Sequence, residues 1–200
     1  MSATPITVET AVVNNDRAFA ALKVGGEVVT WGRATDGGNS SAVEAKLRSD
    51  VTAISSNGHA FAALKAGGEV VTWGDPDNGG NSSAVKAKLR GNVTAIFSGE
   101  SAFAALKAGG EVVTWGRGPA GGDSSAVEAQ LRGNVTAISS GEYAFAALKA
   151  CGEVVTWGSP RHGADSSAVE AELRGNVTAI FTEGWWRSGD LGAMAMPLQR

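Results

Sequence analysis

The chain has little cysteine, proline or histidine: one cysteine, 5 prolines and 2 histidines among 200 residues. A single cysteine, Cys151, excludes an intrachain disulfide and a cysteine-based metal site. The histidines, His59 and His162, have no acidic or nucleophilic companion that repeats with them, so the sequence predicts no triad and no catalytic residues. We therefore expect a protein that is not an enzyme and has neither a cofactor nor a metal.

An excess of charge of one sign and long apolar runs are also missing. The net charge is -3 and 18% of the residues are charged, without the basic stripe typical of nucleic-acid-binding proteins. No window approaches the roughly 18 apolar residues that a membrane-spanning helix needs. Residues 1–10 show no basic patch followed by an apolar run, as a secretory signal would. These absences predict no nucleic-acid partner and no membrane insertion; the location stays open, with the cytoplasm or an organelle favoured.

What the chain does have is glycine, 28 residues of it, and a long repeat. The run AFAALK recurs every 42 residues, and each copy continues with a glycine pair (Cys-Gly in the fourth copy), EVVTWG, a variable stretch, SSAV, LR and VTAI. A fixed period of this length indicates a solenoid or a propeller, in which each unit buries its apolar face on its neighbour. We predict one repeat domain over residues 1–200, with units 9–50, 51–92, 93–134 and 135–176 and a partial capping unit, 177–200.

The third copy shows the structure expected of one unit. Three short β-rich runs are followed by a helical pattern that begins near Asp123. We expect Gly109-Gly110 to form a type I′ hairpin turn, which needs positive φ at both central positions. We expect Ser125 and Glu128 to form a capping box, and Gly133 to end the helix in the left-handed conformation. The expected strands are Val93–Phe97, Ala102–Lys107 and Glu111–Trp115.

The fold class that follows is mainly β with short helices: tandem β-β-β-α units in a propeller-like arrangement. The apolar runs do not alternate with polar residues, which is typical of strands covered on both faces, as in a blade between two other blades. Four and a half units could close a small ring or form an open arc. An open arc would expose strand edges and invite self-association.

The segment VTAISSGEYAFAALKACGEVVTWG, Val135 to Gly158, resembles the repeats of the regulator of chromosome condensation family. Those repeats carry a hairpin with a glycine turn and end in a Trp-Gly pair. The short units also resemble the three-stranded blades of the propeller-type β-lactamase inhibitor protein. The resemblance implies propeller blades over Glu9 to Phe181. It does not imply nucleotide exchange or lactamase inhibition, because the chain has no matching residues for either activity.

Two windows vary between the copies: the turn between the first two strands, and the stretch after Trp-Gly. In an up-down-up meander both windows emerge at the same end of the sheet, and loops at one end of a rigid scaffold are a common binding surface. Tyr, Trp and Arg dominate interface energies, so we take such residues in or next to these windows as candidate partner-binding residues. They are Arg117, Tyr143, Arg161, Trp185 and Trp186.

The sequence thus favours a non-enzymatic protein-protein interaction or scaffold module, whose partner is another protein. One alternative is an accessory structural subunit of a large multiprotein complex, in the cytoplasm or an organelle. A second alternative is a carbohydrate-binding repeat protein. That reading predicts the same aromatic residue in every variable turn, whereas Tyr143 and Trp185 have Ser101 and His59 as counterparts.

Overall fold

The computed structural model describes residues 11–181, which form four three-stranded antiparallel sheets. Each sheet is a meander whose middle strand pairs with both neighbours, so the expected mainly-β class is confirmed. The strands are β1 (Val12–Asn14), β2 (Ala18–Leu22) and β3 (Val28–Gly32); β4 (Val51–Ser56), β5 (Ala60–Lys65) and β6 (Val70–Gly74); β7 (Val93–Ser98), β8 (Ala102–Lys107) and β9 (Val112–Gly116); and β10 (Val135–Ser140), β11 (Ala144–Lys149) and β12 (Val154–Gly158).

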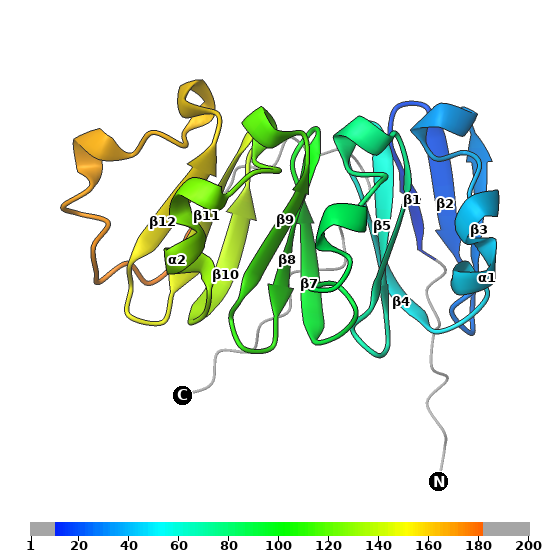
Figure 1. The fold of residues 1–200 in the computed structure, drawn as a ribbon, viewed down its shortest axis with the longest axis horizontal. Helices are drawn as coiled ribbons and strands as arrows, with labels where there is room; N and C mark the ends of the chain where they lie inside the picture. Colours follow the sequence, from blue (N-terminus) through cyan, green and yellow to red (C-terminus); the bar gives the residue numbers. More distant parts are fainter. Residues whose placement is uncertain (1–10, 182–200) are drawn as a thin grey trace, which may run out of the picture.

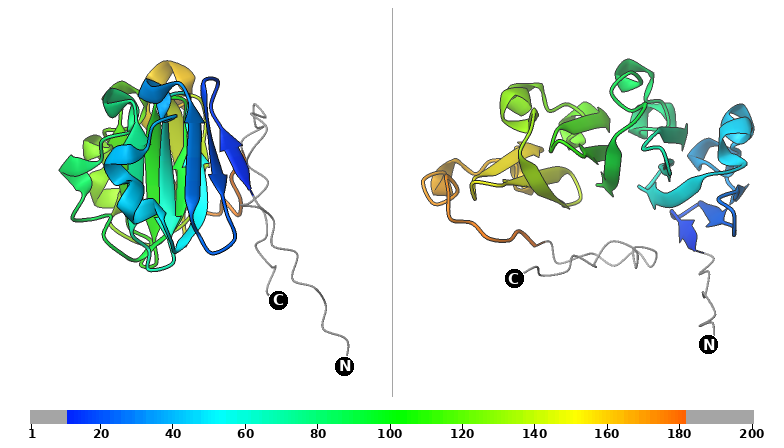
Figure 2. Two further views of the ribbon diagram at one scale, coloured as in Figure 1. Left: turned by 90° about the vertical axis from the view of Figure 1, so that its right-hand side faces the viewer. Right: turned by 90° about the horizontal axis from the view of Figure 1, so that it is seen from below.

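The four sheets, which we call blades 1 to 4, stand side by side in an arc (Figures 1 and 2). The first strands of successive blades, β1, β4, β7 and β10, contact one another on the inner side of the arc, and the helical segments lie on its outer side. Of the two arrangements expected, the described residues form the open arc and do not close a ring.

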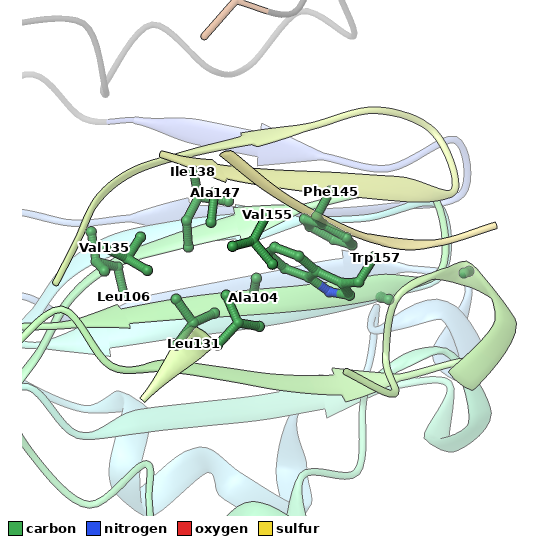
Figure 3. Packing of buried hydrophobic residues seen from close by; sticks show 12 residues of the cluster. Ala104, Leu106, Leu131, Val135, Ile138, Phe145, Ala147, Val155 and Trp157 are labelled. Atoms are coloured by element: carbon green, nitrogen blue, oxygen red, sulfur yellow. The ribbon is translucent and has the colours of Figure 1, made fainter. Parts of the chain in front are cut away.

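Strand side chains alternate between the two neighbouring blades. We call the face toward the preceding blade the leading face, and the face toward the next blade the trailing face. In β5, Phe61 and Ala63 pack with blade 1, whereas Ala60 and Ala62 pack with blade 3. Both faces are therefore apolar, which explains the unbroken apolar run. The same junction between blades 3 and 4 is shown in Figure 3, where Phe145, Val155 and Trp157 meet Ala104 and Leu131.

The Trp-Gly motif joins each blade to the preceding one. The indole N–H of Trp73 donates to the carbonyl oxygen of Gly37 in blade 1 at 3.0 Å. Trp115 and Trp157 repeat this bond toward Gly79 and Gly121, at 3.1 Å each. Each of these indoles also stacks on the phenylalanine paired with it across the sheet, for example Phe61 on Trp73 with ring centroids 5.3 Å apart. The tryptophan thus provides both apolar contact and a directional bond between blades.

The hairpin turns differ from the expected type I′ form. In blades 2 to 4 only the second glycine of the pair has positive φ, for example 75° at Gly110. The Gly110 N–H donates to the Lys107 carbonyl, which matches a three-residue hairpin with a glycine bulge. A Cβ at Gly110 would lie 2.6 Å from the Asn134 nitrogen, so close approach also requires glycine there. In blades 2 to 4 the first position has no positive φ, and the space around Gly67 and Gly109 is open, which is why Cys151 fits at the same position without strain.

The helical segments are shorter than expected and are capped differently. In blade 3, Ser125 is the first residue of a 3-10 turn, and the Asp123 carboxylate accepts its backbone N–H at 2.9 Å. No side chain caps the helix that follows, so the predicted capping box of Ser125 and Glu128 is wrong. The residue with positive φ after the helix is Asn134, at 62°, and not Gly133. Leu131 is buried against blade 4, as its position on the apolar side predicts.

Two of the four units have an α-helix: α1 (Glu44–Leu47) and α2 (Glu128–Leu131). Short 3-10 turns account for the other helical segments, and a turn of this kind follows the third strand of every blade. They are η1 (Ala34–Asp36), η2 (Ser41–Val43), η3 (Pro76–Asn78), η4 (Ser83–Val85), η5 (Gly118–Ala120), η6 (Ser125–Val127), η7 (Pro160–His162) and η8 (Ser167–Val169). No helix among residues 11–181 is long and apolar enough to cross a membrane.

Candidate functional site

The two variable windows lie at the same end of the arc, which we call the loop end (the upper edge in Figure 1). Backbone bonds hold each pair of windows together: the N–H of Arg117 donates to the Ser101 carbonyl, and that of Ser159 donates to the Tyr143 carbonyl. The loop end comprises residues 15–17, 57–59, 99–101 and 141–143, and residues 33–36, 75–78, 117–120 and 159–162.

Hydrogen bonds between blades hold the loop end in a fixed shape. The N–H of Gly58 donates to the Glu100 carbonyl at 3.0 Å, and the N–H of Glu100 donates to the Glu142 carbonyl at 2.6 Å. In blade 2 the buried Asn57 accepts from the N–H groups of His59 and Ala60 and donates to the Asn78 carbonyl. The first turns of blades 2, 3 and 4 are therefore bonded to one another, and the Asn57 bonds join the two windows within blade 2.

The same position carries asparagine in blades 1 and 2 but glycine in blades 3 and 4. Asn15 repeats the bonds of Asn57, with its amide donating to the Asp36 carbonyl at 2.9 Å. The sequence reasoning treated this column as part of a variable turn and missed its structural role. An asparagine three residues before AFAALK in two copies was the available signal.

Between blades 1 and 2, the loop end holds a buried carboxylate, Asp36. Arg33 lies 3.1 Å from it, His59 3.3 Å and Arg17 3.6 Å. Burial tends to raise the pKa of Asp36, but hydrogen bonds from His59 and Thr35 and the two guanidiniums outweigh it, so that pKa lies below its ordinary value. His59 comes from blade 2 and Asp36 from blade 1, so the cluster joins the two blades. The sequence reasoning missed it because the other copies do not repeat these residues.

Between blades 3 and 4, the loop end carries a cluster around Tyr143. The Tyr143 ring meets His162 edge-on, with ring centroids 4.8 Å apart. A hydrogen bond with Glu142, partial burial and the charges of Glu142 and Glu100 raise the Tyr143 pKa, and the nearby charge of Arg117 acts in the opposite direction. The structure therefore brings the predicted residues Arg117 and Tyr143 together.

The other predicted site residues are placed as follows. Arg161 is exposed in η7, next to His162, and so adjoins the Tyr143 cluster. Trp185 and Trp186 lie outside the described residues. The side chains of Arg117, Arg161 and His162 are exposed, and Tyr143, whose ring contacts His162, is half-buried. Aromatic and guanidinium groups presented in this way are suited to contact with a protein surface.

A metal site needs several acidic, histidine or cysteine side chains close together. In the described part of the chain, no three His, Cys, Asp or Glu side chains lie close enough together to hold a metal ion. The buried carboxylate of Asp36 is surrounded by cationic partners of its own. The described groups at this end provide aromatic contact, hydrogen bonding and charge pairing.

Comparison with known proteins supports the fold at the level of structure only. No known family profile and no curated protein sequence matches the chain. The crystal structure of human WBSCR16 is similar over 76% of this chain and 48% of its own, with a TM-score of 0.50 and 21% identity. Prp20p of Saccharomyces cerevisiae, the yeast RCC1, is similar over 74% of this chain and 42% of its own, with a TM-score of 0.50 and 22% identity.

The chain thus spans less than half the length of these two structures. Prp20p is described in terms of its binding to Gsp1p and histones, which is a property of that protein. The likeness confirms the resemblance that the sequence indicated: four blades built like the propeller repeats of the regulator of chromosome condensation type.

Proposed function

We propose that this protein is a protein-interaction module that binds another protein through the loop end, with Tyr143, Arg117 and Arg161 as principal contacts. The Tyr143 cluster is the observation that carries the proposal. It presents an aromatic ring and two arginines on the rigid framework of blades 3 and 4. Binding to a preorganised surface loses less conformational entropy than binding to mobile loops.

Charge gives the partner a preferred character. Arg117 and Arg161 are exposed, and neither forms a salt bridge with another of residues 11–181. Glu142, which hydrogen-bonds to Tyr143, and Glu100 contribute negative charge near the Tyr143 ring and raise its pKa. A partner with a carboxylate for the arginines and an apolar group for the Tyr143 ring would complement this surface.

Carbohydrate binding gains no support from the loop end. The column of Tyr143 holds Arg17, His59 and Ser101 in the other blades, so the described blades do not repeat an aromatic platform. A structural subunit of a larger complex would use the same contacts as the interaction module and differs only in the permanence of the complex.

The experiment compares proteins retained by the immobilised full chain with those retained by the double variant Tyr143→Ala, Arg161→Ala. Arg132→Ala is the matched control, because Arg132 is exposed at the end of α2, on the outer side of the arc. We expect at least about tenfold weaker affinity of any partner for the double variant, since such anchors contribute 2 kcal/mol or more, and no change for the control. A partner that binds the double variant as tightly as the original chain would contradict the proposal.

A further inference from the structure

The leading face of blade 1 is apolar, and none of the described residues 11–181 covers it as blade 1 covers blade 2. Phe19, Val29 and Trp31 are 38%, 43% and 44% exposed. Their counterparts in blade 2, Phe61, Val71 and Trp73, are 0%, 3% and 4% exposed, because blade 1 covers them. Trp31 still stacks on Phe19, with ring centroids 5.2 Å apart and 6° between the planes, so the exposed face has the same local geometry as the covered ones.

The trailing face of blade 4 is the matching surface. At the three internal junctions, a Cβ at Gly37, Gly79 or Gly121 would lie 2.5–2.7 Å from the phenylalanine ring of the next blade. A Cβ added at Gly163, the counterpart in blade 4, would have none of residues 11–181 beyond its chain neighbours within 4 Å. Nearby, Val169 is 47% exposed, and Ala146 is only partly buried although its counterpart Ala104 is fully buried.

We propose that a second copy of this chain docks the leading face of its blade 1 on the trailing face of blade 4. The same pair of faces meets three times inside the chain, at the junctions of blades 1–2, 2–3 and 3–4, which shows that they fit. In the docked pair, the Trp31 indole donates to the Gly163 carbonyl and the Phe19 ring covers Gly163. The contact is head-to-tail, so successive copies form a closed ring or a filament.

Residues 177–181 help to decide what can cover the trailing face of blade 4. Ile180 is the counterpart of Ile54, and with Ala144, Ala146 and Gly163 it lines a cavity at the trailing face. These residues must move aside for β1 of the incoming copy. They form no strand, and residues 182–200 lack the AFAALK and EVVTWG runs that place phenylalanine, valine and tryptophan on a leading face. A second copy supplies all three in register.

The charged rim of this contact differs from the internal junctions. Between blades 1 and 2, Lys46 pairs with Glu69 at 2.8 Å. The counterparts at the proposed contact are Glu172 and Glu27, which are both acidic. The association therefore rests on the apolar faces, and added salt should leave it unchanged or strengthen it by screening this repulsion. Dissociation on adding salt would contradict docking by these faces.

The first test is the mass of the full chain in solution, measured by light scattering over a series of concentrations. We expect association beyond one 20.2 kDa chain as concentration rises. Val29→Asp should weaken it about tenfold or more, because it places a charge in the apolar contact. Val24→Asp is the matched control, because Val24 is 65% exposed in the hairpin of the same blade. A chain that stays at 20.2 kDa throughout, or a Val29→Asp variant that associates like the original, would overturn the proposal.

Mixing two variants tests the head-to-tail arrangement. It also distinguishes a blocked face from a variant that has failed to fold. Val29→Asp blocks the leading face of blade 1 and leaves the trailing face of blade 4 intact, whereas Ala146→Asp does the reverse. Neither variant should self-associate, but an equimolar mixture should form a 1:1 complex through the one intact pair of faces. Both variants should keep the circular dichroism spectrum of the original chain. A mixture of folded variants that remains monomeric would refute the head-to-tail contact.

Discussion

The tryptophans of blades 2 to 4 bond to the preceding blade, whereas the tryptophan of blade 1 has no such bond within the described residues. The same substitution can therefore be compared at a bonded and at an unbonded position of the repeat. Trp115→Phe removes the 3.1 Å hydrogen bond to the Gly79 carbonyl, at a site where Trp115 is 4% exposed. Losing the bond leaves the buried Gly79 carbonyl without a partner, which costs about 1–3 kcal/mol. The smaller phenylalanine ring leaves a cavity between the blades, which costs about 1 kcal/mol more. Trp31→Phe changes the same motif at a site that is 44% exposed, where no described residue accepts a bond from the indole. We expect Trp115→Phe to lower the free energy of unfolding by about 2–4 kcal/mol, and Trp31→Phe by less than about 0.5 kcal/mol.

The assay is urea unfolding followed by circular dichroism, at a protein concentration low enough to keep the chain monomeric. The slope of the transition must be compared between variants, because a repeat array can unfold in parts and a changed slope would invalidate the comparison. In a thermal scan, the Trp115→Phe midpoint should fall by about 4–16 °C, since 1 kcal/mol corresponds to 2–4 °C at this size. Equal losses for the two variants would refute the reasoning, because the effect would then belong to the stacked pair within one blade and not to the contact between blades.

Two further predictions concern a glycine column and the buried carboxylate. Gly79→Ala should destabilise the chain by more than about 2 kcal/mol, because Gly79 has a φ of 101° and an added Cβ would lie 2.7 Å from the Phe103 ring. Gly67→Ala is its control, with open space and no positive φ, and should change the free energy of unfolding by less than about 1 kcal/mol, toward greater stability; paired urea titrations decide whether the two differ. The pKa of Asp36 is lowered in the folded chain, so its ionised form contributes stability above about pH 4, and this is lost as pH falls through the lowered value. Asp36→Asn should therefore be less stable than the original at pH 7, with the difference shrinking below about pH 4; a difference independent of pH would contradict the role assigned to the carboxylate.

Much of the fold could be predicted from the sequence because each unit repeats its own pattern. The AFAALK and EVVTWG runs mark two strands in every blade, and the structure places them at Ala102–Lys107 and Val112–Gly116 in the third. The unbroken apolar character of these runs indicates burial on both faces, and the blades do cover each other in that way. Period and burial could be predicted because they depend on residue type and spacing alone.

Turns and helix ends were predicted less well, because the favoured conformation of a short segment depends on what it contacts. A glycine pair favours a type I′ turn in isolation, but Gly110 is held against the start of the next unit and only that glycine takes positive φ. Ser125 and Glu128 match a capping box, but it is the Asp123 carboxylate that accepts a hydrogen bond from the Ser125 N–H. In each case a nearby group that the pattern did not include decided the outcome.

Some features of the candidate site could be predicted from the sequence and others could not. That both variable windows meet at one end follows from strand direction, and the sequence indicates it. That Tyr143 contacts His162, and that Asp36 of one blade bonds to His59 of the next, depends on how neighbouring blades are placed. These residues are not repeated, so no internal comparison between copies could find them.

The tryptophans show most directly what the sequence determines and what the tertiary structure determines. The sequence by itself determined that a Trp-Gly pair ends the third strand of each unit. The three-residue turn, which the structure revealed, sets the register that places this tryptophan opposite a phenylalanine. Only the tertiary structure decided that Trp115 is buried and bonded while Trp31, in the same motif, is exposed. The physical reason is that apolar burial and the indole hydrogen bond both need a preceding blade, and within the described arc blade 1 has none.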